Sequence, residues 1–363
     1  MCIAILTTTH PTYRFIILNN RDEFLSRPTA PARWWSSPGS STNTAATSPP
    51  VLSARDLARP AHGTWLGINK VGRVGVLTNC LETDCARAVG GRSRGSVIKD
   101  WLTSCPSGER MGGHARDVNG KEQGSIEEFV SSLADLGDVG GFNLLIGDVR
   151  EADHGRGLAI ISNRRAGGAL ASDSASLSGY CAPSGEAREQ LQVRWVDWGG
   201  IESGTGETIA LSNMTLGDDD HQSKWKKVAL GEKLTAEAVG ASLRAGDEED
   251  VLIERLFEVL STDTLPCLPG GFEESAEAYL GLLRESIYIP VIGKAVQHRK
   301  DKGATVLNPS YMDGLYGTQT QTVMLIGHDG RVRLIARTLF DEGGRRLSGE
   351  ESESRFDFVV GMS

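Results

Sequence analysis

The sequence predicts an α+β fold, and three observations indicate it. Short runs of alternating or continuous apolar residues, typical of β-strands, occur in both the first and the last part of the chain. Three segments between them have the apolar spacing of amphipathic helices. With 39% hydrophobic residues among 363, the chain can bury a large core. We therefore expect two antiparallel sheets covered by helices.

The first part of the chain predicts two hairpins separated by a loop. The hairpin strands are residues 2–8 with 13–20, joined by a turn-rich link, and residues 64–68 with 74–78, joined through Gly72. Between the hairpins, residues 36–50 are rich in Ser, Thr, Pro and Gly. This segment lacks the apolar content needed to pack, so we expect a mobile loop.

Helices and further strands follow. Ser125 and Glu128 form a capping box ahead of a helical apolar pattern that reaches residue 136. Two more helices are expected at 249–260 and 273–287. Strands are predicted at 142–148, 158–162 and 208–211, and as a hairpin of 322–326 with 332–337 that turns at Asp329-Gly330.

Composition excludes several classes of protein. Asp and Glu (47) outnumber Lys and Arg (38), so no basic footprint for nucleic acid is present. No run of apolar residues is long enough to span a membrane, and the N-terminus has the pattern of neither a signal peptide nor a mitochondrial presequence. The six cysteines show no CxxC spacing, which is typical of reduced thiols in the cytosol. The seven histidines are scattered, so no metal site is expected.

Cys2 is the most informative residue, because removal of Met1 would put a thiol and a free α-amine on one residue. An amine with a pKa of about 7.7–8.0 beside a thiol with a pKa of about 8.5 is a nucleophile that carries its own base. The alternative interpretation is a buried strand cysteine behind an uncleaved start. The residues downstream of Cys2 favour the first interpretation.

An ordered series of motifs runs through nearly the whole chain. It comprises Met1-Cys2-Ile3, Asn20-Arg21-Asp22-Glu23, Gly63-Thr64-Trp65-Leu66-Gly67, Leu77-Thr78-Asn79, Ser93-Arg94-Gly95, Gly141-Phe142-Asn143-Leu144, Leu211-Ser212-Asn213, Tyr316-Gly317-Thr318 and Arg337-Thr338-Leu339. With these motifs the chain resembles the transport and Golgi organisation 2 family, also called the NRDE family. The resemblance implies one domain over residues 1–363 with the four-layer αββα fold of the N-terminal-nucleophile (Ntn) hydrolases.

The resemblance also implies roles for individual residues. Asp22 matches the carboxylate that holds the free amine in cysteine Ntn hydrolases, while Asn79 and Asn213 match the two amides that stabilise the oxyanion. For each Asn, capping of a turn or strand end is the alternative. The same motifs supply candidate substrate- or ligand-binding residues, which are Asn20, Arg21, Glu23, Trp65 and Asn143.

The chain departs from these patterns at several positions. In the hydrolases an Arg lies three residues before the Asp, where this chain has Asn19. Arg21 is adjacent to Asp22 and should point to the other side of an extended strand. If Arg21 pairs elsewhere, we expect the Cys2 thiolate to lose its cationic partner. Departures within the family pattern are His62, where a second Gly is usual, Ser53-Ala54, where a Gly pair is usual, and Gln319, where an Arg is common.

The sequence contains one basic cluster, and it is compatible with three functions. Residues 224–227 are interpreted as a solvated loop rather than an anion or acyl-carrier site. The first function is a Cys2-dependent amidase or thioesterase that acts on N-acyl or acyl-thioester substrates and needs no cofactor. The second is a carrier of haem, acyl-CoA or another small hydrophobic ligand. The third is a scaffold that supports Golgi organisation and secretion. Members of the family are linked to the cytoplasm, the Golgi and mitochondria, and the features of this chain favour the cytoplasm. The resemblance also implies a role in haem, acyl-CoA or lipid homeostasis.

Overall fold

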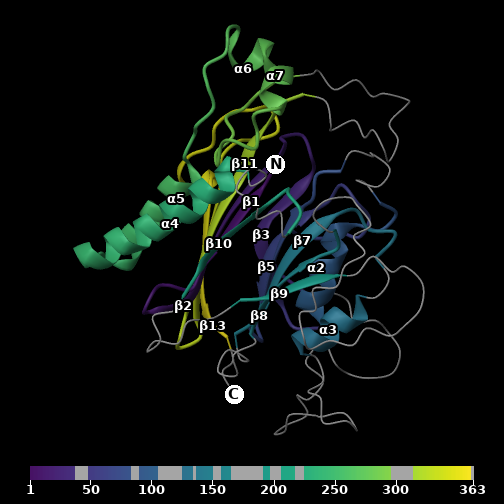
Figure 1. Ribbon diagram of the computed structural model, residues 1–363, viewed down its shortest axis with the longest axis vertical. Helices are drawn as coiled ribbons and strands as arrows, with labels where there is room; N and C mark the ends of the chain where they lie inside the picture. Colours follow the sequence, from purple (N-terminus) through teal and green to yellow (C-terminus); the bar gives the residue numbers. More distant parts are fainter. Residues whose placement is uncertain are drawn as a thin grey trace, which may run out of the picture.

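The computed structural model describes residues 1–36, 48–82, 90–104, 125–133, 136–149, 157–164, 191–196, 206–216, 225–295 and 314–360. Two antiparallel sheets pack face to face (Figure 1). One sheet has the order β10-β1-β2-β11-β12-β13, with β1 (Ile3–Thr7), β2 (Tyr13–Phe24), β10 (Thr208–Ser212), β11 (Tyr316–Gly327), β12 (Arg331–Thr338) and β13 (Glu353–Val359). The other runs in sequence order through β3 (Thr29–Trp35), β4 (Val51–Asp56), β5 (Leu66–Asn69), β6 (Arg73–Asn79), β7 (Phe142–Asp148), β8 (Leu158–Ser162) and β9 (Gln192–Trp195).

Helices cover the outer face of each sheet. The helices α4 (Lys226–Ala245) and α5 (Glu249–Leu260) pack on the first sheet through an apolar cluster that includes Ile3, Ile5 and Leu18. The helices α2 (Arg94–Thr103) and α3 (Ile126–Ser132) pack on the second sheet. A further core fills the space between the sheets. The structure is therefore the expected α+β sandwich with four layers in the order αββα.

Most predicted strands are confirmed. Alternate residues of these strands are buried on the two opposite faces of a sheet. The β1–β2 hairpin pairs Ile3 with Asn20, and the β5–β6 turn passes through Gly72 at a φ of +97°. Gly330 supplies the left-handed residue of the β11–β12 turn. Most of the expected mobile loop, residues 37–47, lies outside the described residues, as do the three cysteines at 85, 105 and 181. The other three, Cys2, Cys80 and Cys267, are free thiols.

The predicted helix at 273–287 is wrong. The chain there forms two short helices, α6 (Gly271–Glu274) and α7 (Ala276–Leu280), followed by turns. Gly270 and Gly271 have positive φ, and Gly281 ends α7. The apolar residues of this segment surround the N-terminus instead of lying along a sheet, and Figure 1 shows α6 and α7 above it. Among the helices in the described residues, the others are longer, apart from the 3₁₀ turn η3 (Gly349–Glu351).

The structure also contains α4, which the sequence pattern did not predict. Two glycines in its interior, Gly231 and Gly240, lower the intrinsic helix propensity. Gly231 has a packing role, since a Cβ there would lie 2.9 Å from Cδ1 of Ile5 on β1. Gly246 ends α4 in the left-handed conformation. Among the described helices, none has both the length and the apolar character required to cross a bilayer.

Candidate active site at the N-terminus

Cys2 lies at the open end of β1, beside the end of β2. Ile3 pairs with Asn20 in the β1–β2 ladder, so the next position places Cys2 beside Arg21. The Cys2 Sγ lies 3.7 Å from the backbone oxygen of Asp22. The backbone oxygen of Cys2 accepts a 2.7 Å hydrogen bond from Ser212 Oγ on β10. Three strands therefore fix the position of the thiol.

The α-amine lies on Met1 in this structure, and three polar groups hold Met1. The amine donates a hydrogen bond to the Tyr316 hydroxyl and lies 3.7 Å from Asp22 Oδ2. Lys227 Nζ donates a hydrogen bond to the Met1 carbonyl oxygen. The Met1–Cys2 peptide is thus enclosed by polar groups from β2, β11 and α4.

Asp22 is the buried anion of this site. Its Oδ1 accepts a 2.7 Å hydrogen bond from Thr318 Oγ1, whereas Oδ2 is buried without a hydrogen-bond partner among the described residues. Lys227 Nζ lies 3.6 Å from Oδ2. Both side chains of this ion pair are fully buried, so each charge depends on the other for compensation.

The interpretation of the basic cluster as a solvated loop is therefore wrong for Lys227. Lys226 is exposed and pairs with Glu285, as a solvated residue would. Lys227, one position further along α4, points inward. Side chains of consecutive helical residues lie about 100° apart, so the period of α4 separates the two lysines. Because α4 was not predicted, Lys227 could not be assigned to the interior from the sequence.

Burial dominates the electrostatics of the site. It lowers the pKa of the Met1 amine from its ordinary 8.0, although the Asp22 charge opposes this. Burial also lowers the pKa of Lys227, again against Asp22. The pKa of the Cys2 thiol is raised by burial, and the nearby amine and Arg21 act against that increase. With Met1 in place, Cys2 is consequently a poor nucleophile at neutral pH.

Arg21 points away from Asp22, as the strand alternation predicts. Its guanidinium donates a hydrogen bond to Gln319 Oε1 and lies 4.6 Å from the centre of the Trp65 ring. The expectation that such pairing would deprive Cys2 of its cationic partner stays a prediction, because the pKa of the thiol is raised by burial although the Arg21 charge acts against this increase. Cys2 and Arg21 lie on the same side of the sheet, and the Arg21 charge lowers the pKa of the thiol. Gln319, which replaces the Arg common in the family, serves as a neutral acceptor for this guanidinium.

The two candidate oxyanion amides lie at the ends of strands from different sheets, and the Leu81 amide bonds the Asn213 backbone oxygen between them. Asn79 is the last residue of β6, and Asn213 follows β10, whose Ser212 pairs with Ile3. Asn213 Oδ1 is buried without a hydrogen-bond partner among the described residues. The Asn143 side chain, in contrast, is held by hydrogen bonds, because its Nδ2 donates to the backbone oxygens of Ser212 and Met214. Asn143 therefore holds the segment that carries Asn213.

Two other candidate residues have local structural partners. Asn20 is fully buried, and its Nδ2 donates to the backbone oxygens of Leu260 and Ile287, which ties β2 to the helical layer. Glu23 is half-buried and lies 3.5 Å from Arg27. The residues that the sequence interpretation missed are Lys227, Tyr316 and Thr318. The last two belong to the matching motif at 316–318, but its sequence alone did not indicate their contact with Asp22.

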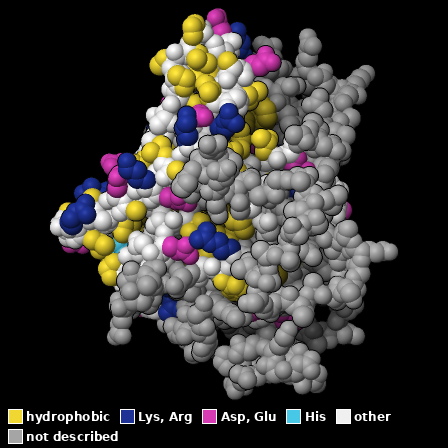
Figure 2. Space-filling view, viewed as in Figure 1, with side chains coloured by type: hydrophobic (Ala, Val, Ile, Leu, Met, Phe, Trp, Pro, Cys, Tyr) yellow, Lys and Arg dark blue, Asp and Glu magenta, His cyan; other side chains and the backbone are white. Residues whose placement is uncertain are grey.

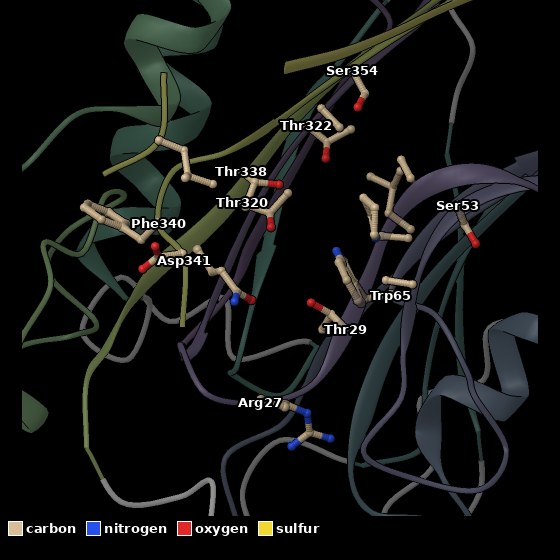
Figure 3. A pocket seen from close by; sticks show the side chains of 18 of the residues that line it. Arg27, Thr29, Ser53, Trp65, Thr320, Thr322, Thr338, Phe340, Asp341 and Ser354 are labelled. Atoms are coloured by element: carbon tan, nitrogen blue, oxygen red, sulfur yellow. The ribbon is translucent and has the colours of Figure 1, made fainter. Parts of the chain in front are cut away.

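A cavity of about 310 Å³ lies between the sheets, next to the two residues that contact the Arg21 guanidinium. Its lining includes Gln319 and Trp65, but not Cys2. Figure 3 shows Trp65 facing threonine side chains of β11 and β12 across the cavity, with Arg27 at one end. Arg21 is not part of this lining, but its guanidinium contacts two of the lining residues, Gln319 and Trp65.

Two motifs far apart in the sequence meet next to the second sheet. Gly63 packs so closely on Gly95 that a Cβ on Gly63 would lie 2.4 Å from the Gly95 carbonyl carbon. His62, in place of a second Gly, adopts a positive φ of 44°. Such a conformation is costly for a residue with a Cβ, which explains why glycine suits this position.

The fold and this N-terminal constellation define a four-layer αββα protein with a cysteine at its second position. A model of the Transport and Golgi organisation 2 family matches residues 1–341, and the chain belongs to this family. A Saccharomyces cerevisiae protein is 26% identical over 99% of this chain and 100% of its own length. The Mus musculus Transport and Golgi organization 2 homolog is 26% identical over 92% of this chain and 90% of its own. The Homo sapiens homolog is 27% identical over 91% and 88%.

Solved structures of hydrolases are similar at low identity. A Caenorhabditis elegans N-acylethanolamine-hydrolyzing acid amidase ortholog has 12% identity and a TM-score of 0.37, covering 73% of this chain and 87% of its own. A mutant conjugated bile acid hydrolase from Clostridium perfringens has 11% identity and a TM-score of 0.39, covering 100% and 98%.

Proposed function

We propose that the protein is an N-terminal-nucleophile hydrolase of amides or thioesters, with Cys2 as the nucleophile after removal of Met1. One observation carries the proposal. The Met1 amine lies 3.7 Å from the buried carboxylate of Asp22, whose Oδ2 has no hydrogen-bond partner among the described residues, and the Cys2 thiol lies 3.7 Å from the backbone oxygen of the same residue. A free amine on Cys2 would supply the donor that this oxygen lacks.

The proposed reaction has two stages, acylation and deacylation of Cys2. The Cys2 α-amine takes the thiol proton, and the sulfur attacks the substrate carbonyl carbon. Asn79 and Asn213 stabilise the oxyanion. The C–N or C–S bond breaks, and the leaving amine or thiol takes the proton from the α-ammonium. Water, deprotonated by the same amine, hydrolyses the acyl-thioester on Cys2 and releases a carboxylic acid.

The surrounding charges support this use of the amine. In the protein that retains Met1, Lys227 and the Met1 amine both lie near the Asp22 carboxylate, and burial, with a smaller effect of the Lys227 charge, lowers the pKa of this amine. A lower pKa increases the neutral fraction, which is the form that acts as a base. The positive charge of Arg21, which lies on the same side of the sheet as Cys2, favours the thiolate form of Cys2.

Turnover tests the proposal directly. Protein without Met1, verified by intact mass, is incubated with N-acyl amino acids and acyl thioesters, and product is followed by mass spectrometry. We expect turnover that Cys2→Ala abolishes and that protein retaining Met1 lacks. Equal turnover by the Cys2→Ala variant would refute Cys2 as the nucleophile.

A carrier is the second candidate function, and the cavity beside Arg21 favours it. Two residues that line this cavity, Gln319 and Trp65, contact the buried guanidinium of Arg21. In a carrier, this guanidinium would pair with a propionate of haem or a phosphate of acyl-CoA. Stoichiometric binding of haem or acyl-CoA without product, weakened by Arg21→Met, would favour this carrier over the hydrolase. The names of the mouse and human relatives suggest that either activity serves Golgi organisation in the cell.

A further inference from the structure

The side chain of Met1 is partly buried and packs against an apolar cluster that is separate from the three sandwich cores. The cluster is built by the segment that carries α6 and α7, with Tyr316 from β11. Its buried members are Tyr279, Leu283, Ile289 and Ile292, and its partly buried members besides Met1 are Leu265, Leu268, Phe272, Leu282 and Tyr316. This segment forms the upper lobe in Figure 1, where Figure 2 shows hydrophobic side chains gathered.

Polar contacts fix the main chain of Met1 at the mouth of this cluster. Tyr316 and Asp22 contact the amine, and Lys227 binds the carbonyl oxygen. The carbonyl carbon of Met1 is bonded directly to the nitrogen of Cys2. Met1 therefore places an unbranched apolar chain in the cluster and a carbonyl group beside the thiol-bearing residue.

Removal of Met1 would leave an apolar pocket beside Cys2. The walls are tied to one another independently of Met1, because Tyr279 Oη donates to the Pro266 oxygen and accepts from the Leu268 amide. Apolar cavities of about 150 Å³ in proteins remain dry and bind small apolar ligands. The space vacated by Met1 would likewise be lined by apolar side chains, with Tyr316 and Lys227 at its mouth.

We propose that this pocket receives the acyl chain of the substrate, and that Met1 is its internal plug until it is removed. The inference rests on the proposed hydrolase function and assigns its substrate class. The chain that fits is unbranched and uncharged like the Met1 side chain, because the cluster itself contributes only apolar side chains and tyrosines. Substrates are therefore short- or medium-chain acyl amides or thioesters, whose carbonyl group lies at the pocket mouth beside Cys2.

Binding is measured in the Cys2→Ala background, where the nucleophile is absent. Two forms of this variant are prepared from a cleavable fusion that leaves either Met1 or residue 2 as the first residue. N-octanoylglycine is titrated into each form by isothermal titration calorimetry. We expect the form that starts at residue 2 to bind at least tenfold more tightly than the form that retains Met1.

Two tryptophan variants of the form that starts at residue 2 locate the binding site. Leu268→Trp extends a side chain into the pocket and should weaken binding at least tenfold, with Leu265→Trp as the substitute if Leu268→Trp does not fold. Leu280→Trp is the matched control, since Leu280 on α7 is 51% exposed, and it should leave binding unchanged. Circular dichroism and thermal unfolding verify that each variant is folded.

Three outcomes would overturn the pocket assignment. They are equal binding by the two forms, binding unaffected by the pocket-filling variants, and no binding by either form. None of them refutes the hydrolase, because hydrolysis of N-acetyl substrates by the protein with Cys2 first is assayed separately. Failure of that hydrolysis together with octanoyl binding would leave the pocket in place and refute the hydrolase.

Discussion

Replacing Lys227 with methionine tests the buried ion pair that organises the N-terminus. Lys227 Nζ and Asp22 Oδ2 are 3.6 Å apart, and both side chains are fully buried. With an effective dielectric constant of about 20, their attraction is about 4–5 kcal/mol. The substitution removes this attraction but leaves the Asp22 carboxylate desolvated. We therefore expect Lys227→Met to lower the free energy of unfolding by about 3–5 kcal/mol.

The assay is urea unfolding of the protein that retains Met1, at pH 7, with two spectroscopic probes to check for a two-state transition. The matched control is Lys226→Met. Lys226 is the adjacent residue, and it pairs with Glu285 at the surface. That variant should lose no more than about 1 kcal/mol. Combining Lys227→Met with Asp22→Asn should cost less than the sum of the two single changes, because the double variant leaves no charge unpaired.

A loss of less than about 0.5 kcal/mol in Lys227→Met would refute the reasoning, because surface substitutions have effects of this size. Equal effects of the substitutions at Lys226 and Lys227 would do the same.

Three further predictions concern pH, catalysis and backbone conformation. Burial lowers the folded-state pKa of Lys227 below 10.5, so between the two values the unfolded state binds more protons and stability rises with pH. Urea titrations across this alkaline window should show the rise in the wild type and lose it in Lys227→Met. If Asn79 and Asn213 are oxyanion donors, changing either to Ala should lower kcat by about 10²–10³-fold with the fold retained, whereas unchanged kcat would assign them to strand-end capping. His62→Gly should raise the melting temperature, since it relieves a positive φ of 44° at a cost of about 1–2 kcal/mol for a residue with a Cβ, and a lower melting temperature would contradict this.

The strands could be predicted from the sequence because their patterns depend on local burial. The strands β7 and β8 have the predicted bounds, as does the helix α5. Prediction failed where long-range packing determines the local conformation. The glycine at 231 in α4 is explained by the approach of Ile5 from β1, which no local pattern reveals. The apolar residues after Gly270 pack around Met1, so their helical spacing produced two short helices instead of one long helix.

The candidate site was predictable only in part for the same reason. Cys2 and Asp22 were found from the N-terminal position and the motif at 20–23, and both lie at the site. The charge of Lys227 could not be assigned without α4, because the sequence does not show which of two adjacent lysines points inward. Predicting the effect of Arg21 on Cys2 requires the register of the β1–β2 pair, which the sequence does not show.

The central claim is that Cys2, once it is the first residue, is an activated nucleophile. Intact mass after treatment with a thiol-directed acylating probe tests it, with peptide mapping to separate Cys2 from the exposed thiol of Cys267. The account predicts that protein without Met1 is labelled at Cys2 at neutral pH and that protein retaining Met1 is not. An unreactive Cys2 in the protein without Met1 would contradict the proposed mechanism.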